Sequence, residues 1–197
     1  MRTKLTSSLT RLRTLPRSRS GAVAIEAVIY IPLLLMAIMI VIDVVRFITT
    51  ATRMDYVAAT AADLASRADT VIDQVNFNTI GANNELAMFF LSANLTGQPD
   101  DVENNGQIII SAIQPTVGGY TLLWQRTGPY GLSMTSRLDE VSQLPTSGTH
   151  LVAEVFFRFR PVILEAINFL SAADTIIYRR AVYRPRKSAM TTLEPAL

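Results

Sequence analysis

The chain contains no cysteine and only one histidine, His150, among its 197 residues. Without cysteine it can hold no disulfide framework, no cysteine-ligated zinc, no iron–sulfur cluster and no thiol nucleophile. A single histidine also excludes a metal site built from several histidines. Glycine and proline account for only nine residues each, which excludes a collagen-like composition. The length suits one modest domain with an appendage.

Acidic residues are absent from the first 21 positions, although this segment holds six basic ones: Arg2, Lys4, Arg11, Arg13, Arg17 and Arg19. The whole chain has a formal net charge of only +2, so the remaining residues contain more acidic than basic side chains. The basic character therefore belongs to residues 1–21 and not to the body of the protein.

A long apolar run follows this basic segment, and Glu26 is the only charged residue within positions 22–42. At about 1.5 Å per residue the run reaches ~31 Å as a helix, which matches the hydrocarbon thickness of a bilayer. A buried core helix is the alternative, but such helices rarely stay apolar on every face for six turns. We therefore predict a transmembrane segment over residues 22–42.

A cleaved secretory signal peptide is the second alternative, and it would require a shorter apolar run followed by a small-x-small cleavage site. Here the run is longer, and it is followed by Asp43-Val-Val-Arg46. The segment should therefore remain in the mature protein. The basic residues that precede it predict a cytoplasmic N-terminus and an extracytoplasmic body from about residue 43.

Gly21 and Glu26 mark the start of the apolar run. A glycine at this border gives a peptidase an easily extended backbone, although it could also simply end or cap a helix. An acid in a bilayer span costs up to a few kcal/mol and suggests a functional role. Glu26 could alternatively extend its carboxylate to the cytoplasmic headgroups.

These residues resemble the type IV pilin-like class, in which prepilin peptidase cuts after a glycine and an acid stands at position five of the mature chain. More narrowly, residues 19–55 resemble the TadE-like proteins of the tight-adherence (Tad) pilus system. The resemblance rests on Gly21-Ala-Val-Ala-Ile-Glu26, on Pro32-Leu-Leu-Leu35 and on the acid and arginine at positions 43 and 46. A weaker similarity to the terminal strands of that family covers residues 152–161 and 176–185.

This resemblance implies a structural, non-enzymatic minor pilin or pseudopilin that takes part in Tad pilus assembly. It implies cleavage of a 1–21 leader between Gly21 and Ala22 and a role for Glu26 in assembly. The expected partners are prepilin peptidase, other pilins or pseudopilins, inner-membrane pilus assembly proteins and membrane lipid. The expected location is the inner membrane, with possible entry into the pilus, and we expect no cofactor and no metal.

The helical period continues beyond the membrane segment. Small and apolar residues recur at three- and four-residue steps between Ala51 and Ala65, which predicts one helix over residues 22–67. Pro32 removes a backbone hydrogen bond and should bend this helix. The alanine-rich stripe could pack on the chain's own domain or on other helices.

Residues 68–186 are expected to form an extracytoplasmic α+β domain with a small antiparallel sheet, giving a pilin-like architecture in which the long helix continues into that domain. The pattern predicts strands over 107–113, 120–127, 150–160 and 175–183. It predicts helices over 83–94 and 162–170. A solvated acidic loop is expected over 96–106 and a flexible tail over 187–197.

The sequence contains no nucleophile-elbow motif, no P-loop and no dinucleotide-binding glycine pattern. His150 is expected to be an ordinary polar residue at a strand edge. The alternation in Phe156-Phe-Arg-Phe-Arg160 predicts one core face and one solvent face, although this run and the later arginines could touch nucleic acid or anionic lipid. We favour the strand interpretation and expect no nucleic-acid partner. Two other functions stay open: a single-span sensor or ligand-binding protein, and a membrane-anchored enzyme, which the missing motifs disfavour.

Overall fold

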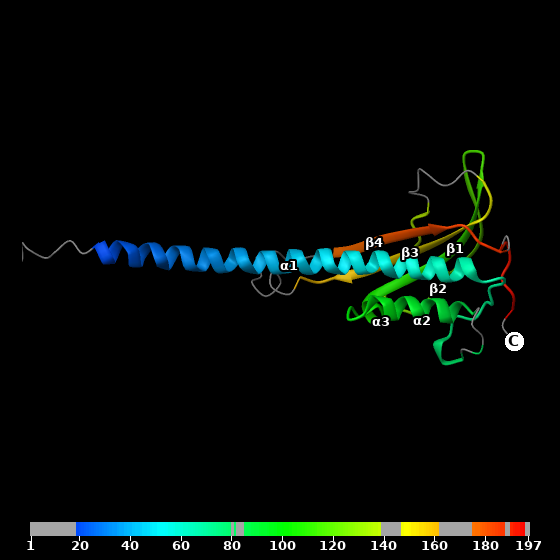
Figure 1. The fold of residues 1–197 in the computed structure, drawn as a ribbon, viewed down its shortest axis with the longest axis horizontal. Helices are drawn as coiled ribbons and strands as arrows, with labels where there is room; N and C mark the ends of the chain where they lie inside the picture. The colour runs from blue at the N-terminus through cyan, green and yellow to red at the C-terminus, as the bar shows by residue number, and fades with distance from the viewer. Residues whose placement is uncertain are drawn as a thin grey trace, which may run out of the picture. The chain divides into compact units, whose positions relative to one another are not determined.

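The computed structural model describes residues 19–79, 81, 85–138, 147–161, 175–187 and 190–195. The chain divides into two compact units between Ile42 and Asp43. Helix α1 (Arg19–Arg67) contributes to both units, and Figure 1 shows its second half running alongside the strands. The predicted helix was expected to begin at Ala22, but the described helix already begins at Arg19. The predicted helix over 162–170 lies outside the described residues.

The second unit contains four antiparallel strands, β1 (Gly106–Thr116), β2 (Gly119–Thr127), β3 (His150–Phe159) and β4 (Thr175–Tyr183). Their order in the sheet is β2-β1-β3-β4, so β1 and β3 are the inner strands. Both inner strands are buried over most of their length, as expected for strands covered on two faces. The predicted α+β class, with a long apolar helix leading to an antiparallel sheet, is confirmed.

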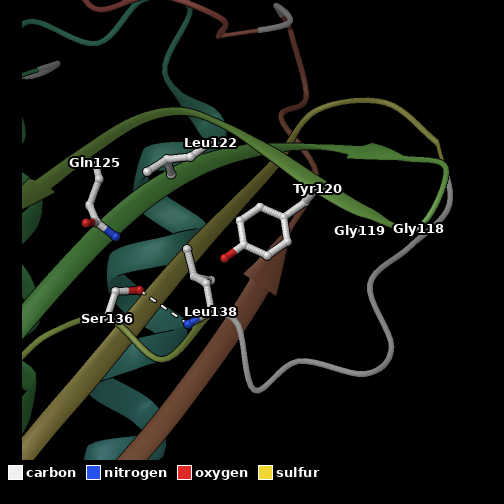
Figure 2. Close-up of a pocket in the computed structure, with 7 residues that line it drawn as sticks. All are labelled: Gly118, Gly119, Tyr120, Leu122, Gln125, Ser136 and Leu138. Atoms are coloured by element: carbon white, nitrogen blue, oxygen red, sulfur yellow. Dashed lines mark hydrogen bonds between the residues drawn. The ribbon is translucent and has the colours of Figure 1, made fainter.

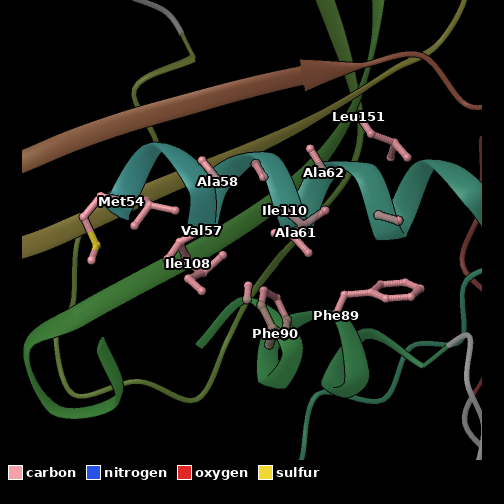
Figure 3. Close-up of a cluster of buried hydrophobic side chains, with 14 of the residues drawn as sticks. Met54, Val57, Ala58, Ala61, Ala62, Phe89, Phe90, Ile108, Ile110 and Leu151 are labelled. Atoms are coloured by element: carbon pink, nitrogen blue, oxygen red, sulfur yellow. The ribbon is translucent and has the colours of Figure 1, made fainter. Parts of the chain in front are cut away.

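One face of the sheet packs against α1 and against α2 (Leu86–Gly97). The α1 residues at this contact recur every three or four positions, as one face of a helix must. The contact includes Met54, Val57, Ala58, Ala61, Ala62 and Ala65 from α1, Phe89 and Phe90 from α2, and Ile108, Ile110 and Leu151 from the sheet. Figure 3 shows small alanine side chains of α1 facing larger side chains from the sheet and α2. The alanine-rich stripe, within this unit, therefore packs on the chain's own domain.

The opposite face of the sheet is also covered, by a segment that we call the cover segment (residues 128–138). Leu132 packs against Ile109 and Phe156, and Leu138 packs against Ile113 and Val152. The sequence predicted one core face and one solvent face for the run that includes Phe156. That prediction was wrong for this residue, because Phe156 is fully buried beneath the cover segment.

Three local predictions needed correction. The second helix, α2, begins at Leu86 and ends at Gly97, so it lies further along the chain than 83–94. The acidic loop contains a short helix, α3 (Val102–Asn105). Asp101 caps its first turn, because the Asp101 side chain accepts a hydrogen bond from the Asn104 amide. The β1–β2 hairpin turns at residues 117–118, because β1 continues to Thr116.

The expectation of a flexible tail was wrong for residues 190–195. Met190 is buried, and its carbonyl oxygen accepts a hydrogen bond of 2.9 Å from Trp124 Nε1. The Glu194 amide donates to the Val71 carbonyl, and the Asp73 amide donates to the Glu194 carbonyl. These backbone pairs hold the segment in place despite its polar sequence, which is why its composition alone was misleading.

Candidate processing and assembly segment

Gly21 lies in the first turn of α1, and its surroundings are open. The residue is exposed, and a Cβ built on it would meet no atom within 4 Å. Because α1 begins at Arg19, the Gly21–Ala22 bond is helical here, whereas a peptidase needs extended backbone. Glycine lowers the cost of unwinding this turn by about 1 kcal/mol relative to alanine. The glycine is thus not required by packing, and it makes the first turn easier to open.

Glu26 lies one turn further along α1, with an exposed side chain. Its exposed neighbours are apolar and include Val23, Ile25 and Ile29. Among the described residues, no side chain forms a hydrogen bond or ion pair with Glu26. A lone carboxylate in an apolar surface is costly to take out of water, so a partner outside this chain's described fold would stabilise it.

Pro32 lies inside α1, which continues through it as a helix. The bend that we predicted at this position stays a prediction. The proline removes one backbone donor from a segment whose side chains are almost all exposed. It therefore weakens the helix locally without disturbing any packed core.

The remainder of residues 22–42 presents an apolar surface that the described residues leave largely exposed. Large side chains here, including Leu33, Leu34 and Leu35, are each more than half exposed. The most apolar stretch of 18 residues in the helix has a mean hydropathy of 2.8, and only 6% of that stretch is buried. The helix is long and apolar enough to cross a membrane, and a membrane anchor is the role that this surface suggests.

The second unit begins with a buried acid. Asp43 is 3% exposed, and Arg46 Nη1 lies 3.6 Å from its Oδ1, so the acid and arginine highlighted by the sequence resemblance form an ion pair.

Further along α1, the Asp100 carboxylate accepts hydrogen bonds from Thr50 Oγ1 at 3.2 Å and from Arg53 Nη1 at 3.1 Å. Asp100 was expected in a solvated loop. It instead ties that loop to α1, a long-range contact for which the sequence held no signal.

Glu154 is a second acid that the sequence did not single out. It is fully buried on the cover-segment face of the sheet. Its carboxylate accepts hydrogen bonds from the Ser136 hydroxyl, from the Arg137 amide at 2.8 Å and from the Tyr178 hydroxyl at 2.9 Å. Burial, followed by the nearby carboxylate of Glu154, raises the pKa of Tyr178 to about 12. This cluster fixes the cover segment to the sheet.

His150 differs from its expected environment. It opens the inner strand β3, is 3% exposed, and its Nε2 lies 3.0 Å from the Ser147 carbonyl oxygen. The prediction of an ordinary polar edge residue was therefore wrong. The side chain is nevertheless paired with backbone, and it belongs to no metal-binding cluster: among the described residues, no group of three or more His, Asp or Glu side chains could hold a metal ion.

A hollow beside the cover segment is shown in Figure 2. It has a volume of about 630 Å³, and its lining comes from the β1–β2 hairpin and the cover segment: Gly118, Gly119, Tyr120, Leu122, Gln125, Ser136 and Leu138. Among these described lining residues there is no paired acid and base and no activated nucleophile. The hollow therefore lacks the arrangement that a hydrolytic site would need.

Comparison with known proteins finds a similarity in the N-terminal part of the chain. No curated protein and no solved structure matches the chain. The model of the family described as TadE-like protein matches residues 21–63, which span Gly21, Glu26, Pro32 and the Asp43–Arg46 pair. The resemblance predicted from these residues is confirmed over this segment, and residues 21–63 are similar to that family.

Proposed function

We propose that this chain is a non-enzymatic minor pilin or pseudopilin that takes part in assembly of a Tad-type adhesion pilus. In this proposal prepilin peptidase removes residues 1–21 on the cytoplasmic side. Residues 22–42 then cross the inner membrane, and the sheet domain lies outside the cytoplasm. The TadE-like family match associates the chain with the Tad pilus, and the further assignment to a subunit class is ours.

The proposal rests mainly on Glu26, an exposed carboxylate in the otherwise uncharged run of residues 22–42, with no partner among the described residues. An acid used only for anchoring gains nothing over alanine at this position. Its cost in lipid must therefore be offset by an interaction that the described residues do not make.

Cleavage after Gly21 would supply a partner for this carboxylate. It would leave a new α-amino group on Ala22, and an ordinary α-amino group is mostly cationic at pH 7. Residues 22 and 26 are one helical turn apart, so an internal pair is possible. The amine of a neighbouring subunit is the alternative, and we favour it because such a pair forms only on assembly. Either pair gains strength where water is scarce.

The expected partners follow from the same segment. The exposed apolar surface of residues 22–42 suits membrane lipid before assembly and the apolar helices of other pilins or pseudopilins within an assembly. The basic leader and Gly21 suit prepilin peptidase. Inner-membrane pilus assembly proteins would bind the subunit after cleavage and before it contacts other pilins.

Variants of Glu26 test this function. Glu26→Ala and Glu26→Gln should both insert into the membrane and be cleaved, because neither step needs the carboxylate. Co-assembly should fall roughly tenfold or more, which corresponds to about 1.4 kcal/mol for a lost charge pair. The measurements are quantitative crosslinking to partner pilins and pilus yield at wild-type expression. Tyr30→Phe, which changes a polar group one turn away without changing charge, is the matched control and should assemble normally.

Normal assembly by both Glu26 variants would contradict the proposed role of this residue. If the chain also remained uncut in cells with active prepilin peptidase, a single-span sensor or binding protein would become the better description.

A further inference from the structure

A second hollow lies at the end of the sheet domain where α1 ends. It has a volume of about 400 Å³. Its described lining consists of Gln114, Gly148, Thr149, Arg184, Pro185, Arg186, Lys187 and Thr191. Every lining side chain other than those of Gly148 and Pro185 can donate hydrogen bonds, and none of these described residues is acidic. Three of the donors are cationic, so the lining is rich in groups that can donate to an anion.

Two of the three cations already have partners. Arg186 Nη2 lies 3.0 Å from Asp63 Oδ1, and Lys187 Nζ lies 3.1 Å from Asp69 Oδ1. The Arg186 amide also donates to the Ser66 carbonyl at 2.9 Å, which fixes the backbone of this segment to the end of α1. These contacts position the basic segment without filling the hollow, because both acids lie outside its described lining.

Arg184 is different. Its side chain is exposed, and it forms no ion pair with a carboxylate among the described residues. It lies close against Gly148, where a Cβ would come within 3.2 Å of Arg184 Nη2. Gly148 has a φ of +79°, a conformation that glycine adopts without strain. The Gly148 backbone, which carries no side chain, therefore lies beside the Arg184 guanidinium, and both residues line the hollow.

We propose that this hollow, which we call the basic pocket, binds a phosphate group. Guanidinium groups present fixed forks of N–H donors that match phosphate and carboxylate oxygens, and an ammonium adds a further point charge. Arg184 brings to the lining a guanidinium that forms no ion pair among the described residues, and Gln114, Thr149 and Thr191 add neutral donors, so the lining suits an anion with more than two acceptor oxygens. A tetrahedral phosphate offers these, whereas a carboxylate offers only two. The phosphate could belong to a soluble phosphate ester or to a lipid headgroup.

This site goes beyond the proposed pilus role and does not depend on it. The sequence has 12 basic and 15 acidic residues from Asp43 onward, so the positive charge of the basic pocket is local and is not a property of the whole domain. A local positive hollow in a net acidic domain favours a defined anion over general attraction to negative polymers.

Equilibrium dialysis with inorganic phosphate tests the proposal. The full chain in non-ionic detergent, at constant ionic strength in chloride, should take up phosphate saturably. Arg184→Gln should weaken the affinity about tenfold, because it removes charge-assisted hydrogen bonds. Arg160→Gln is the matched control, since it makes the same charge change after the opposite end of β3, and it should bind as the wild type does.

Trp124 provides an independent signal. It is the only tryptophan in the chain, and its indole donates to the carbonyl of Met190, the residue before Thr191 of the basic pocket. Its fluorescence should change with phosphate in the wild type and in Arg160→Gln, at the concentration that dialysis gives. An unchanged thermal unfolding of Arg184→Gln would show that the variant has kept its fold.

Uptake that does not saturate, or equal losses in Arg184→Gln and Arg160→Gln, would overturn the site. Vesicles of phosphatidylglycerol distinguish the two sources of phosphate once binding is established. Competition between these vesicles and inorganic phosphate would support a lipid headgroup as the ligand, and absence of competition would support a soluble phosphate ester in the same pocket.

Discussion

The two halves of α1 are both rich in apolar residues, but they differ in how far these side chains are buried. Residues 22–42 are apolar around the whole circumference except at Glu26, and nearly all of their described side chains are exposed. Residues 43–67 carry charges on part of their surface. Val44, Val45 and Ile48 are still exposed there, but small and apolar side chains from Ala51 to Ala65 form a buried stripe against the sheet. Hydrophobicity alone therefore does not identify core. The arrangement of apolar residues around the helix separates the exposed surface of residues 22–42 from the stripe that packs on the sheet domain.

The acids of the two units repeat this contrast. Glu26 is exposed and has no partner among the described residues, whereas Glu154 is fully buried and accepts three hydrogen bonds. Glu154 is satisfied by the fold that surrounds it. Under the proposed function, Glu26 is satisfied instead by an amine that cleavage creates. Substitution of Glu154 should therefore change the stability of the fold, whereas substitution of Glu26 should leave that stability unchanged.

The largest expected effect on stability is that of Glu154→Ala. The change leaves the Ser136 hydroxyl, the Arg137 amide and the Tyr178 hydroxyl without their acceptor, which should cost about 3 kcal/mol of unfolding free energy. Chemical unfolding of the detergent-solubilised chain, followed by the fluorescence of Trp124, measures this cost. Glu26→Ala is the control and should leave the unfolding transition in place. Equal losses of unfolding free energy in the two variants would contradict the view that only Glu154 stabilises the fold.

The next effect compares one substitution at two points of the same helix. Ala61 is fully buried against the sheet and α2, whereas Ala37 is exposed in the apolar half. Ala61→Leu should destabilise the sheet domain by about 1–3 kcal/mol, because the closely packed site has no room for a larger side chain. Ala37→Leu should leave the unfolding transition unchanged. A stable Ala61→Leu variant would show that α1 is not packed as described.

The smallest expected effect concerns Tyr178 at alkaline pH. Burial raises the pKa of its hydroxyl to about 12, above the value near 10 of an unfolded tyrosine. The unfolded chain therefore loses this proton first, and the stability contribution present below pH ~10 should fall as the pH rises from ~10 to ~12. Burial also raises the pKa of Tyr130, which adds to the same decline.

Tyr178→Phe should accordingly lower stability by about 1 kcal/mol at neutral pH, through loss of the hydrogen bond to Glu154. It should also reduce, without abolishing, the alkaline decline. Unfolding midpoints between pH 8 and pH 12 measure both changes. An identical decline in wild type and variant would remove Tyr178 as one of its causes.

The sequence predicted those features that depend on local pattern. The apolar run, the alanine stripe and the strand pattern of residues 175–183 indicated the long helix, its packed face and the bounds of β4. The strand prediction also gave β3 nearly to the residue. Each of these patterns is imposed by a single repeating environment, so the sequence of one element is enough to recognise it.

What the sequence could not predict depends on contacts between distant segments. Nothing near Glu154 in the chain indicates that Ser136 and Tyr178 donate to it, and the loop composition around Asp100 gives no sign of Arg53. The tail was misjudged for the same reason, since its hydrogen bond to Trp124 joins residues far apart in the chain. In the N-terminal segment, by contrast, Gly21 and Glu26 could be selected from sequence because their chemistry is unusual for an apolar helix.

The most direct test of the account is the N-terminal residue of the protein in its native membrane. The contrast between the two halves of α1 leads us to expect that residues 1–21 are removed and that the exposed half serves assembly. Terminal sequencing and intact mass should give Ala22 as the first residue in cells with active prepilin peptidase, and Met1 in cells that lack it. An intact N-terminus in both strains would contradict the pilin assignment and would leave residues 22–42 as a simple membrane anchor.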